Sequence, residues 1–299
     1  MIVTSLFLEV IVVEVQMSFK GVETGILYLV PTPIGNLEDM TFRSVRTLQE
    51  VALIASEDTR NTQKLLNHFE ITTPQRSFHE HNYKERIPQL IEILQRGESI
   101  AQVSDAGMPS ISDPGHELVV ACLAAGIKVV ALPGPTAGLT ALIASGLMPQ
   151  PHYFHGFLPR KKKEQLTVLE TFKEQEATII FYESPHRIQK TIQVMMEVFG
   201  ESRQAVVCRE LTKLHEEYLR GTLEELNRYL KEHTIKGECC LMVSGSTEVA
   251  EGIVDPRSLK EQVEALIASG SKPNDSIKEV AKRNQLKKQV VYNEYHEIE

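Results

Sequence analysis

One loop, residues 104–115, constrains the fold of this chain more than any other segment. Gly, Pro, Ser and Asp dominate the loop, which lies between an apolar run over 99–103 and a helix-like run over 116–125. A strand, a turn-rich loop and a helix in this order are typical of α/β sheets, which bind ligands at the carboxyl ends of their strands. Since a bare connection needs only a few residues, the longer loop indicates main-chain groups presented to a ligand. An ordinary loop in which Asp113-Pro114 starts a helix is the alternative.

Two further turns repeat this arrangement. Pro133 to Gly138 follow a β-rich run over 127–132, and Pro31 to Asn36 follow an apolar run over 27–30. Gly134 allows the backbone to turn tightly and to approach a ligand closely. Three such turns, each after an apolar strand, predict one shared ligand cleft.

Apolar strands and helices alternate up to residue 147, which predicts a parallel sheet with helical crossovers and the α/β fold class. Strands are expected at 27–30, 51–55, 99–103, 127–132, 178–182, 204–208 and 238–243. Helices are expected at 42–49, 59–69, 83–95, 116–125, 137–145, 162–173, 185–199 and 222–232. In the second half, a polar turn between 205–208 and 216–220 indicates a hairpin.

Composition shifts divide the chain into segments. We expect an N-terminal extension over 1–25, an α/β domain over 26–148, a second α/β domain over 149–245, and a small C-terminal helical domain over 256–299. A polar linker over 245–255 precedes the last segment. There, apolar residues recur at helical spacing and lysines follow them: Leu259, Val263, Leu266, Ile267, Lys278, Lys282, Lys287 and Lys288. Three short helices, with basic residues on the later ones, resemble a helix-turn-helix module, and a solvated helical tail is the alternative.

The first fifteen residues are strongly apolar but carry Glu9 and Glu14 and no basic residue. This stretch is too short and too acidic for a membrane span, and it lacks the small-residue cleavage site of a signal peptide. We therefore expect no membrane association. Met17 is an alternative start of translation, which would make the preceding residues a mis-called extension.

Composition and motifs exclude several classes of function. The formal net charge is -8, so no global basic field indicates nucleic acid, although a local basic patch stays open. The glycine motifs of phosphate loops, dinucleotide folds and nucleophile elbows are absent. His79 and His81 have no third ligand nearby in sequence, and Cys239 and Cys240 lack a second pair at zinc spacing, so we expect no metal. All four cysteines are predicted to be reduced, which fits a cytoplasmic protein.

Two polar clusters directly follow predicted strands, at the edge where the turns lie. Their members are Glu57, Asp58 and Arg60 in the first cluster, and Glu183, His186 and Arg187 in the second. Both clusters suit substrate binding, and the simpler alternative is that they cap the next helices. A basic run, Arg160 to Lys163, lies at an expected helix start. Positive charge at a helix start is unfavourable to the helix dipole. We therefore favour a role in facing phosphates over a plain solvated helix start.

Five segments together resemble the tetrapyrrole-methylase superfamily. They are residues 30–39, 56–60, 104–115, 132–138 and 181–187. Within that superfamily the chain is similar to the branch that methylates the 2′-hydroxyl of a cytidine ribose in bacterial 16S ribosomal RNA. The resemblance extends from residue 26 to the end. Tetrapyrrole methylases open with a Gly-rich loop ending in Asp, whereas Pro31 to Asn36 stand in that place here. This departure favours an RNA substrate over a porphyrinoid one.

The resemblance implies S-adenosylmethionine as methyl donor, held between two α/β domains in a homodimer that acts on the small ribosomal subunit. The donor-binding positions that it implies are Pro33, Asp105, Gly107, Met108, Ser110, Ile111, Pro133, Gly134, Thr136, Ala137, Tyr182 and Leu211. The in-line attack on a sulfonium mainly requires the nucleophile, the methyl group and the sulfur to be aligned. A ribose hydroxyl is a poor nucleophile, and a nearby base that accepts its proton makes it a better one.

Three carboxylates are candidates for that base, namely Glu57, Asp58 and Glu183. The residues expected to hold RNA phosphates or bases are Arg60, Arg160, Lys161, Lys162, Lys163, His186 and Arg187. Two alternatives come from other classes: a methyltransferase for a tetrapyrrole-type small molecule, and a ribosome-binding module without activity. The basic segments disfavour the first, and the implied donor cleft disfavours the second.

Overall fold

The computed structural model describes residues 15–21, 23–111, 115–246, 257–284 and 286–298, with only the backbone of Lys282 and Arg283. Residues 1–14, Asp113-Pro114 and the expected linker over 247–255 lie outside the described residues. The chain divides into two compact units. One unit runs to Phe172 and resumes over Ala177–Ser244, and the other comprises Lys173–Glu176 and Gly245–Glu299.

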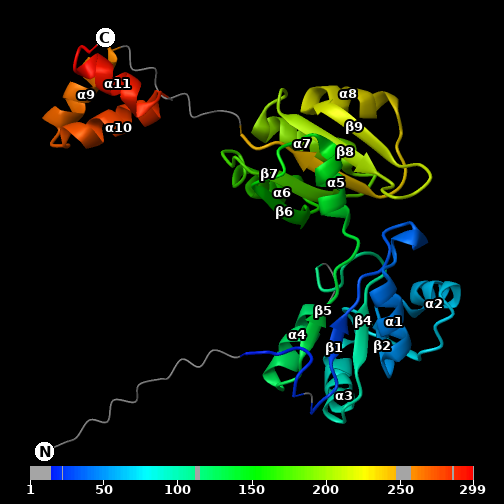
Figure 1. Ribbon diagram of the computed structural model, residues 1–299. Coiled ribbons are helices and arrows are strands. Elements are labelled where there is room, and N and C mark those ends of the chain that lie inside the picture. The colour runs from blue at the N-terminus through cyan, green and yellow to red at the C-terminus, as the bar shows by residue number, and fades with distance from the viewer. Residues whose placement is uncertain (1–14, 22, 112–114, 247–256, 285, 299) are drawn as a thin grey trace, which may run out of the picture. The chain divides into compact units, whose positions relative to one another are not determined.

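The first unit begins with a parallel sheet, as the alternating pattern predicts (Figure 1). Its strands are β1 (Leu27–Leu29), β2 (Leu53–Ser56), β3 (Gln75–Ser77), β4 (Ile100–Val103) and β5 (Val129–Ala131), in the order β3-β2-β4-β1-β5. Four helices cover it: α1 (Phe42–Glu50), α2 (Thr59–His68), α3 (Tyr83–Gln95) and α4 (Gly115–Ala124). Leu48 of α1 and Leu66 of α2 pack in one apolar cluster, and Leu94 of α3 and Leu118 of α4 pack in another. The two clusters show that the sheet is buried on both faces, which explains why its central strands are mostly apolar.

Residues 16–21 lie along the outer edge of β5. The side-chain amide of Gln16 donates to the carbonyl of Val129 at 3.0 Å, and its oxygen accepts from the Val129 N–H at 3.0 Å. The Lys128 ammonium donates to the carbonyl of Met17 at 2.8 Å. These bonds satisfy part of a sheet edge that would otherwise stay unpaired.

The second sheet is mixed. Its strands are β6 (His152–Phe157), β7 (Thr178–Glu183), β8 (Gln204–Arg209), β9 (Glu217–Thr222) and β10 (Cys239–Val243), in the order β6-β7-β10-β8-β9. Only β6 and β7 pair in parallel, and β8 and β9 form the predicted hairpin. Along β7, Ile179 and Phe181 face the helices α6 (Lys162–Glu170), α7 (Ile188–Phe199) and α8 (Leu223–Glu232). Ile180 and Tyr182 face the opposite side.

Helix α5 (Ala137–Ser145) follows β5 in the chain but packs on that opposite side of the second sheet. Its residues Ala141 and Leu142 share an apolar cluster with Ile180 and Met242, and Ile34 from the turn after β1 joins them. The guanidinium of Arg220 fixes the end of the helix by donating to the carbonyls of Ser145 at 3.0 Å and Ala144 at 2.6 Å. One apolar cluster thus contains elements attached to both sheets.

The last segment forms three short helices, as predicted: α9 (Leu259–Ala268), α10 (Pro273–Arg283) and α11 (Lys288–Tyr295). Val263, Ile277, Val280 and Val291 are buried between them. Ser258 starts α9 with a capping box in which Ser258 and Glu261 exchange hydrogen bonds. Among the described residues, no helix has the length and apolar character that crossing a bilayer requires.

The structure corrects three local predictions. The edge strand β3 (Gln75–Ser77) was not expected, because its three residues are polar and give no apolar signal. The strand β6 (His152–Phe157) was not expected either, because it directly follows Pro149 and Pro151, which favour irregular structure. Helix α7 begins at Ile188 and not at Pro185, since the intervening residues form a separate turn.

Candidate ligand cleft

The three turns after β1, β4 and β5 converge, as the sequence predicts. The N–H and carbonyl of Thr32 pair with the carbonyl and N–H of Gly107, both at 3.0 Å. A Cβ on Gly134 would lie 2.3 Å from the side chain of Pro31, so the first and third turns also touch. Gly107 has a φ of +75°, in the left-handed region that favours glycine. The main chain of three loops is therefore locked into one surface.

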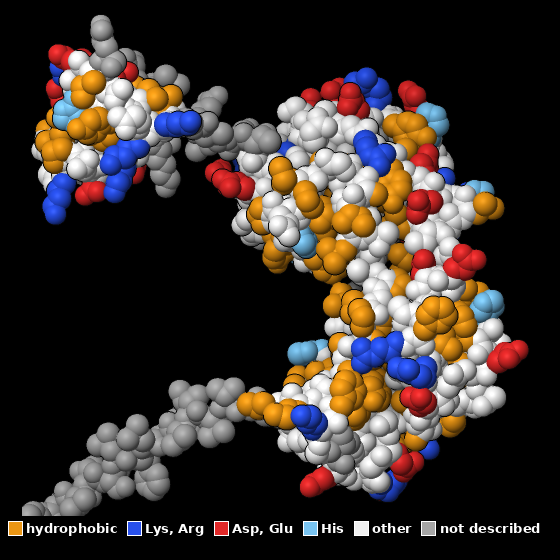
Figure 2. Space-filling view, viewed as in Figure 1, with side chains coloured by type: hydrophobic (Ala, Val, Ile, Leu, Met, Phe, Trp, Pro, Cys, Tyr) orange, Lys and Arg blue, Asp and Glu red, His pale blue; other side chains and the backbone are white. Residues whose placement is uncertain are grey.

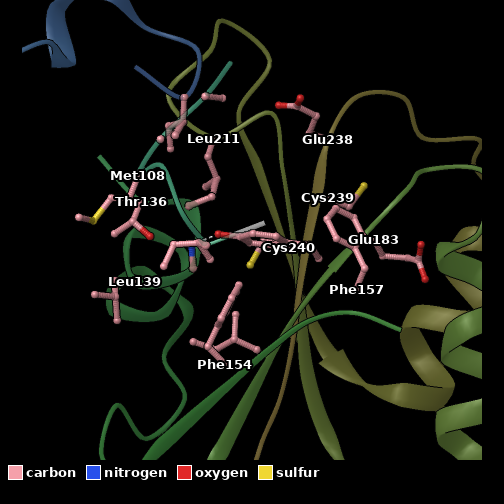
Figure 3. A pocket seen from close by; sticks show the side chains of 18 of the residues that line it. Met108, Thr136, Leu139, Phe154, Phe157, Glu183, Leu211, Glu238, Cys239 and Cys240 are labelled. Atoms are coloured by element: carbon pink, nitrogen blue, oxygen red, sulfur yellow. Dashed lines mark hydrogen bonds between the residues drawn. The ribbon is translucent and has the colours of Figure 1, made fainter. Parts of the chain in front are cut away.

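That surface forms one wall of a cleft of about 670 Å³, and the second sheet forms the other wall. Figure 3 shows Met108, Thr136 and Leu139 on one side and Phe154, Phe157 and Cys240 on the other. The full lining is Ile34, Ala106, Gly107, Met108, Ile111, Thr136, Ala137, Gly138, Leu139, His152, Phe154, Phe157, Ile180, Tyr182, Glu183, Ser184, Pro185, Leu211, Glu238, Cys239 and Cys240. A largely apolar cavity of this size, with a few polar groups, is typical of a small-molecule site.

Tyr182 lies at the centre of an aromatic group in the cleft. Its ring packs edge-on against Phe154 at 5.0 Å and Phe157 at 5.7 Å between centroids. Its hydroxyl accepts a hydrogen bond from the N–H of Gly138 at 3.2 Å, at the start of α5. Burial raises the pKa of Tyr182 above its usual value, so the phenol stays protonated in the cleft.

The structure brings seven of the positions implied by the resemblance into the cleft. They are Gly107, Met108, Ile111, Thr136, Ala137, Tyr182 and Leu211. Five others, Pro33, Asp105, Ser110, Pro133 and Gly134, do not line it. Sequence reasoning missed Phe154 and Phe157, although an aromatic run after two prolines was a signal for a strand beside the cleft.

Asp105 faces helix α2 and not the cleft. Its carboxylate accepts from the N–H of Asp58 at 3.2 Å and from the side-chain amide of Asn61 at 3.0 Å. In return, the N–H of Asp105 donates to the Glu57 carboxylate at 3.1 Å. These bonds join the carboxyl ends of β2 and β4 and hold three carboxylates together there.

Asp58 caps helix α2. Its carboxylate accepts from the Arg60 N–H at 2.8 Å and forms an ion pair with the Arg60 guanidinium at 2.7 Å. The side-chain hydrogen bond from Arg60 is the main reason why the pKa of Asp58 falls from its usual 3.8 to about 2. Asp58 therefore acts as the cap of helix α2, which was the simpler of the two alternatives.

Glu183 and Arg187 form a second charged pair, at the end of β7. The Glu183 carboxylate is buried and accepts from the N–H of Ser184 at 2.8 Å and the hydroxyl of Thr191 at 2.7 Å. Arg187 lies 3.4 Å from it and donates to the carbonyls of Leu158 and Pro159. His186, between them in sequence, is exposed.

The basic run lies at the start of α6 and is partly neutralised. Lys161 pairs with Glu164 at 3.2 Å, and Lys162 pairs with Glu197 at 2.6 Å. Arg160 and Lys163 have no carboxylate within ion-pair distance in the described part of the chain. The run follows β6 directly, so it stands at the sheet edge where Phe157 lines the cleft.

Leu211 reaches the cleft from a constrained loop after β8. Its neighbours Glu210 and Thr212 have φ values of +50° and +67°, which non-glycine residues rarely adopt. The Lys213 ammonium holds the loop by pairing with Glu210 at 2.9 Å and Glu238 at 3.0 Å. A Cβ on Gly35 would lie 2.5 Å from the Lys213 side chain, so this lysine also touches the turn after β1. No sequence motif indicated this clamp.

The described residues contain no group of three or more Cys, His, Asp or Glu side chains arranged to hold a metal ion. His79 lies in the turn between β3 and α3, where its N–H donates to the Asn82 side chain at 2.9 Å.

Comparison with known proteins agrees with the fold. Residues 26–227 match the family described as Tetrapyrrole (Corrin/Porphyrin) Methylases. The chain therefore belongs to the tetrapyrrole methylase family, as the sequence resemblance predicted.

Curated relatives match along almost their whole length. "Ribosomal RNA small subunit methyltransferase I" of Streptococcus pyogenes serotype M1 is 55% identical over 287 residues, which are 95% of this chain and 100% of that protein. The protein of the same name from Bacillus subtilis (strain 168) is 50% identical over 286 residues, which are 94% of this chain and 98% of that protein.

Solved structures share the fold at much lower identity. Uroporphyrin-III-C-methyltransferase from Thermus thermophilus has a TM-score of 0.53 at 19% identity, covering 74% of this chain and 94% of that one. Diphthine synthase has a TM-score of 0.58 at 14% identity, covering 75% and 91%.

We predict that Asp58 titrates near pH 2 and that Arg60→Ala returns its pKa toward 3.8, because the Arg60 hydrogen bond is the largest cause of the shift. Since the folded pKa is depressed, the stability that this pair contributes is fully present above about pH 4 and is lost as the pH falls through about 2. Side-chain carboxyl NMR over this pH range measures both values. A wild-type Asp58 that titrates near 3.8 would show that the pair does not form in solution.

Proposed function

We propose that this protein transfers a methyl group from S-adenosylmethionine to small-subunit ribosomal RNA, at the 2′-hydroxyl of a cytidine ribose. The observation that carries the proposal is the cleft of about 670 Å³, built from strand-end turns in a chain of the methylase family. Relatives with 50–55% identity over nearly the whole chain carry the name "Ribosomal RNA small subunit methyltransferase I", which supports the substrate class.

The cleft residues fit this donor. A nucleoside with a sulfonium requires apolar and aromatic surface for its base and positive centre, and main-chain groups for its polar parts. Phe154, Phe157 and Tyr182 supply the aromatic surface. The main chain at Gly107 and Thr136 lines the cleft. A Cβ on Gly107 would lie 3.3 Å from the Ile34 side chain, so glycine allows the main chain to come close. When bound, S-adenosylmethionine supplies an activated methyl group.

The chain's own contribution is to align the ribose hydroxyl and to accept its proton. Of the three candidate carboxylates, Asp58 is engaged by Arg60, and Glu183 accepts two hydrogen bonds while buried. Glu57 accepts the Asp105 N–H through one oxygen, and its other oxygen has no hydrogen bond among the described residues. Glu57 does not line the cleft itself but bonds to Asp105, next to the cleft residue Ala106, and we therefore assign proton acceptance to Glu57.

Exposed cations near the strand ends are proposed to hold the RNA backbone. Arg60 has a side chain that is 87% exposed, and Arg160 and Lys163 stand at the start of α6. A splayed or single-stranded nucleotide is the target that this arrangement admits, because the ribose must enter a cleft between two sheets.

A homodimer and a cytoplasmic location belong to the same proposal. Figure 2 shows hydrophobic side chains gathered over α5 and β6, and the exposed fractions are 81% for Ile143, 68% for Met148 and 50% for Tyr153. A contiguous apolar surface of this kind marks an interaction site. The four cysteines carry buried, unpaired thiols, and burial raises the pKa of Cys208 to about 12, as expected of structural cysteines in a reducing compartment.

Incubation with methyl-labelled donor and unmodified small ribosomal subunits tests the function. The purified RNA is digested to nucleosides and analysed by mass spectrometry. The proposal expects label in 2′-O-methylcytidine, and none in large subunits or in uroporphyrinogen. Label in a base-methylated nucleoside would contradict the ribose assignment, and label only in the tetrapyrrole would contradict the RNA assignment.

We predict that Gly107→Ala lowers the affinity for S-adenosylmethionine by about tenfold or more, because a side chain there strains the turn and narrows the cleft. The matched control is Gly126→Ala, since Gly126 also has a positive φ, +68°, but a Cβ there meets nothing within 4 Å. Calorimetry measures the affinity for S-adenosylmethionine. Thermal unfolding measures the loss of stability that both variants share, because each places alanine at a positive φ. Equal donor affinity in both variants would remove Gly107 from the donor site.

Ending the chain after Ser246 should leave donor affinity within about twofold, because the cleft residues all precede that point. Binding to small subunits should weaken, and its log-log salt slope should become shallower by about 2, as Lys278, Lys287 and Lys288 are lost. Filter binding over a salt series measures the slope. An unchanged slope would show that the C-terminal helices do not contact RNA.

Ile143→Glu should convert the dimer to a monomer, because it places a charge on the exposed apolar face of α5. Val120→Glu on α4, where the residue is 51% exposed, is the control and should stay dimeric. Sedimentation velocity distinguishes the two states. A monomeric wild type, or a dimeric Ile143→Glu variant, would contradict this face as the interface.

A further inference from the structure

Arg187 donates to protein carbonyls and is only partly exposed. Its Nη2 donates to the carbonyl of Pro159 at 2.8 Å and to that of Leu158 at 3.1 Å, and only 29% of its side chain is exposed. The guanidinium is suited to this task, because the two N–H groups of Nη2 reach two carbonyls while Glu183 balances the positive charge. Arg187 therefore connects the turn after β7 to the loop after β6.

The buried carboxylate of Glu183 orients the Arg187 guanidinium. Its side chain is 1% exposed, and both carboxylate oxygens accept hydrogen bonds, from Ser184 and from Thr191. Figure 3 shows the carboxylate directed away from Phe154 and Cys240, which lie at the centre of the cleft. A buried carboxylate has to be paired, and the Arg187 guanidinium at 3.4 Å supplies the opposite charge.

The loop that they hold leads directly into the basic run. Leu158 is buried in the apolar cluster beneath α6 and α7, and the Pro159 carbonyl also accepts from the Gln165 amide at 2.8 Å. Arg160 and Lys163 follow. Unlike Lys161 and Lys162, which pair with Glu164 and Glu197, they have no carboxylate at ion-pair distance in the part of the chain that is described.

We propose that Glu183 and Arg187 are positioning residues: they fix the loop between β6 and α6 beside the cleft, so that Arg160 and Lys163 hold the RNA backbone. The inference rests on the proposed function. It removes Glu183 from the candidate bases and Arg187 from the direct phosphate ligands, because either role would require these residues to release bonds that define the loop.

The first test compares Arg187→Lys with Arg187→Met. A lysine keeps the charge, but its side chain is shorter and its ammonium cannot take the place of Nη2 at both carbonyls. Both variants should therefore raise the KM for small subunits by about tenfold, leave kcat within about threefold and leave donor affinity unchanged. A direct phosphate ligand would behave differently, since lysine also binds phosphate and Arg187→Lys would resemble the wild type. That result would overturn the proposal. Arg228→Lys is the control, because Arg228 pairs with Glu224 at 2.8 Å on the exposed face of α8.

A double-mutant cycle shows whether Arg187 acts through the basic run. In a chain that already carries Arg160→Gln and Lys163→Gln, Arg187→Lys should have no further effect on the KM for subunits. Gln165→Leu removes the second donor to the Pro159 carbonyl without touching the cleft, and should raise KM in the same direction. Additive effects in the cycle would contradict the proposal.

Glu183→Gln separates positioning from base catalysis. The amide still accepts from Ser184. If Glu183 only positions the loop, KM should rise and kcat should stay within about threefold, whereas loss of a general base should lower kcat at saturating RNA.

Trypsin cleavage after Arg160 to Lys163, mapped by mass spectrometry, measures how firmly this loop is held in the absence of RNA. Faster cleavage in Arg187→Lys with an inactive wild type would reject the proposed function and keep the positioning role. An unchanged cleavage rate with an active wild type would reject the positioning role alone.

Discussion

The apolar face of the second sheet has to be covered, and α5 covers it. Ile180, Val206 and Met242 on that face are buried against Ala141 and Leu142 of the helix. Truncating one such buried side chain costs about 2–5 kcal/mol, so the packing fixes the helix firmly. Because α5 follows β5 of the first sheet, its N-terminal end brings the turn at Thr136 to the second sheet. The cleft lies at that junction, with Ile34 from the first turn in the same cluster.

The sequence predicted the parts of the site that depend on local backbone chemistry. The turns at Pro31, Gly107 and Gly134 could be recognised because glycine and proline after an apolar strand have few structural uses. The parallel sheet followed from the alternation of strands and helices, and the hairpin followed from the polar turn between two strands. Strand β3 and the start of α7 were not predictable in this way, since Gln75–Ser77 is polar and Pro185 resembles the first turn of a helix.

The roles of the charged residues were less predictable, because some of their partners are distant in the chain. Arg187 bonds to the carbonyls of Leu158 and Pro159, and Lys213 connects Glu210 with Glu238. Position at a strand end therefore identified residues beside the cleft but did not distinguish a carboxylate that is engaged from one that is available. The hydrogen bonds make that distinction: Asp58 and Glu183 are engaged, and Glu57 keeps one oxygen without a partner among the described residues.

A crystal structure with S-adenosylhomocysteine, the product of the donor, tests the central claim most directly. We predict that the nucleoside lies in the cleft between the two sheets, with its polar groups on the main chain near Gly107 and Thr136 and its sulfur beside Tyr182. A nucleoside bound elsewhere on the chain, with the cleft unchanged, would contradict the assignment of this cleft as the methyl-donor site.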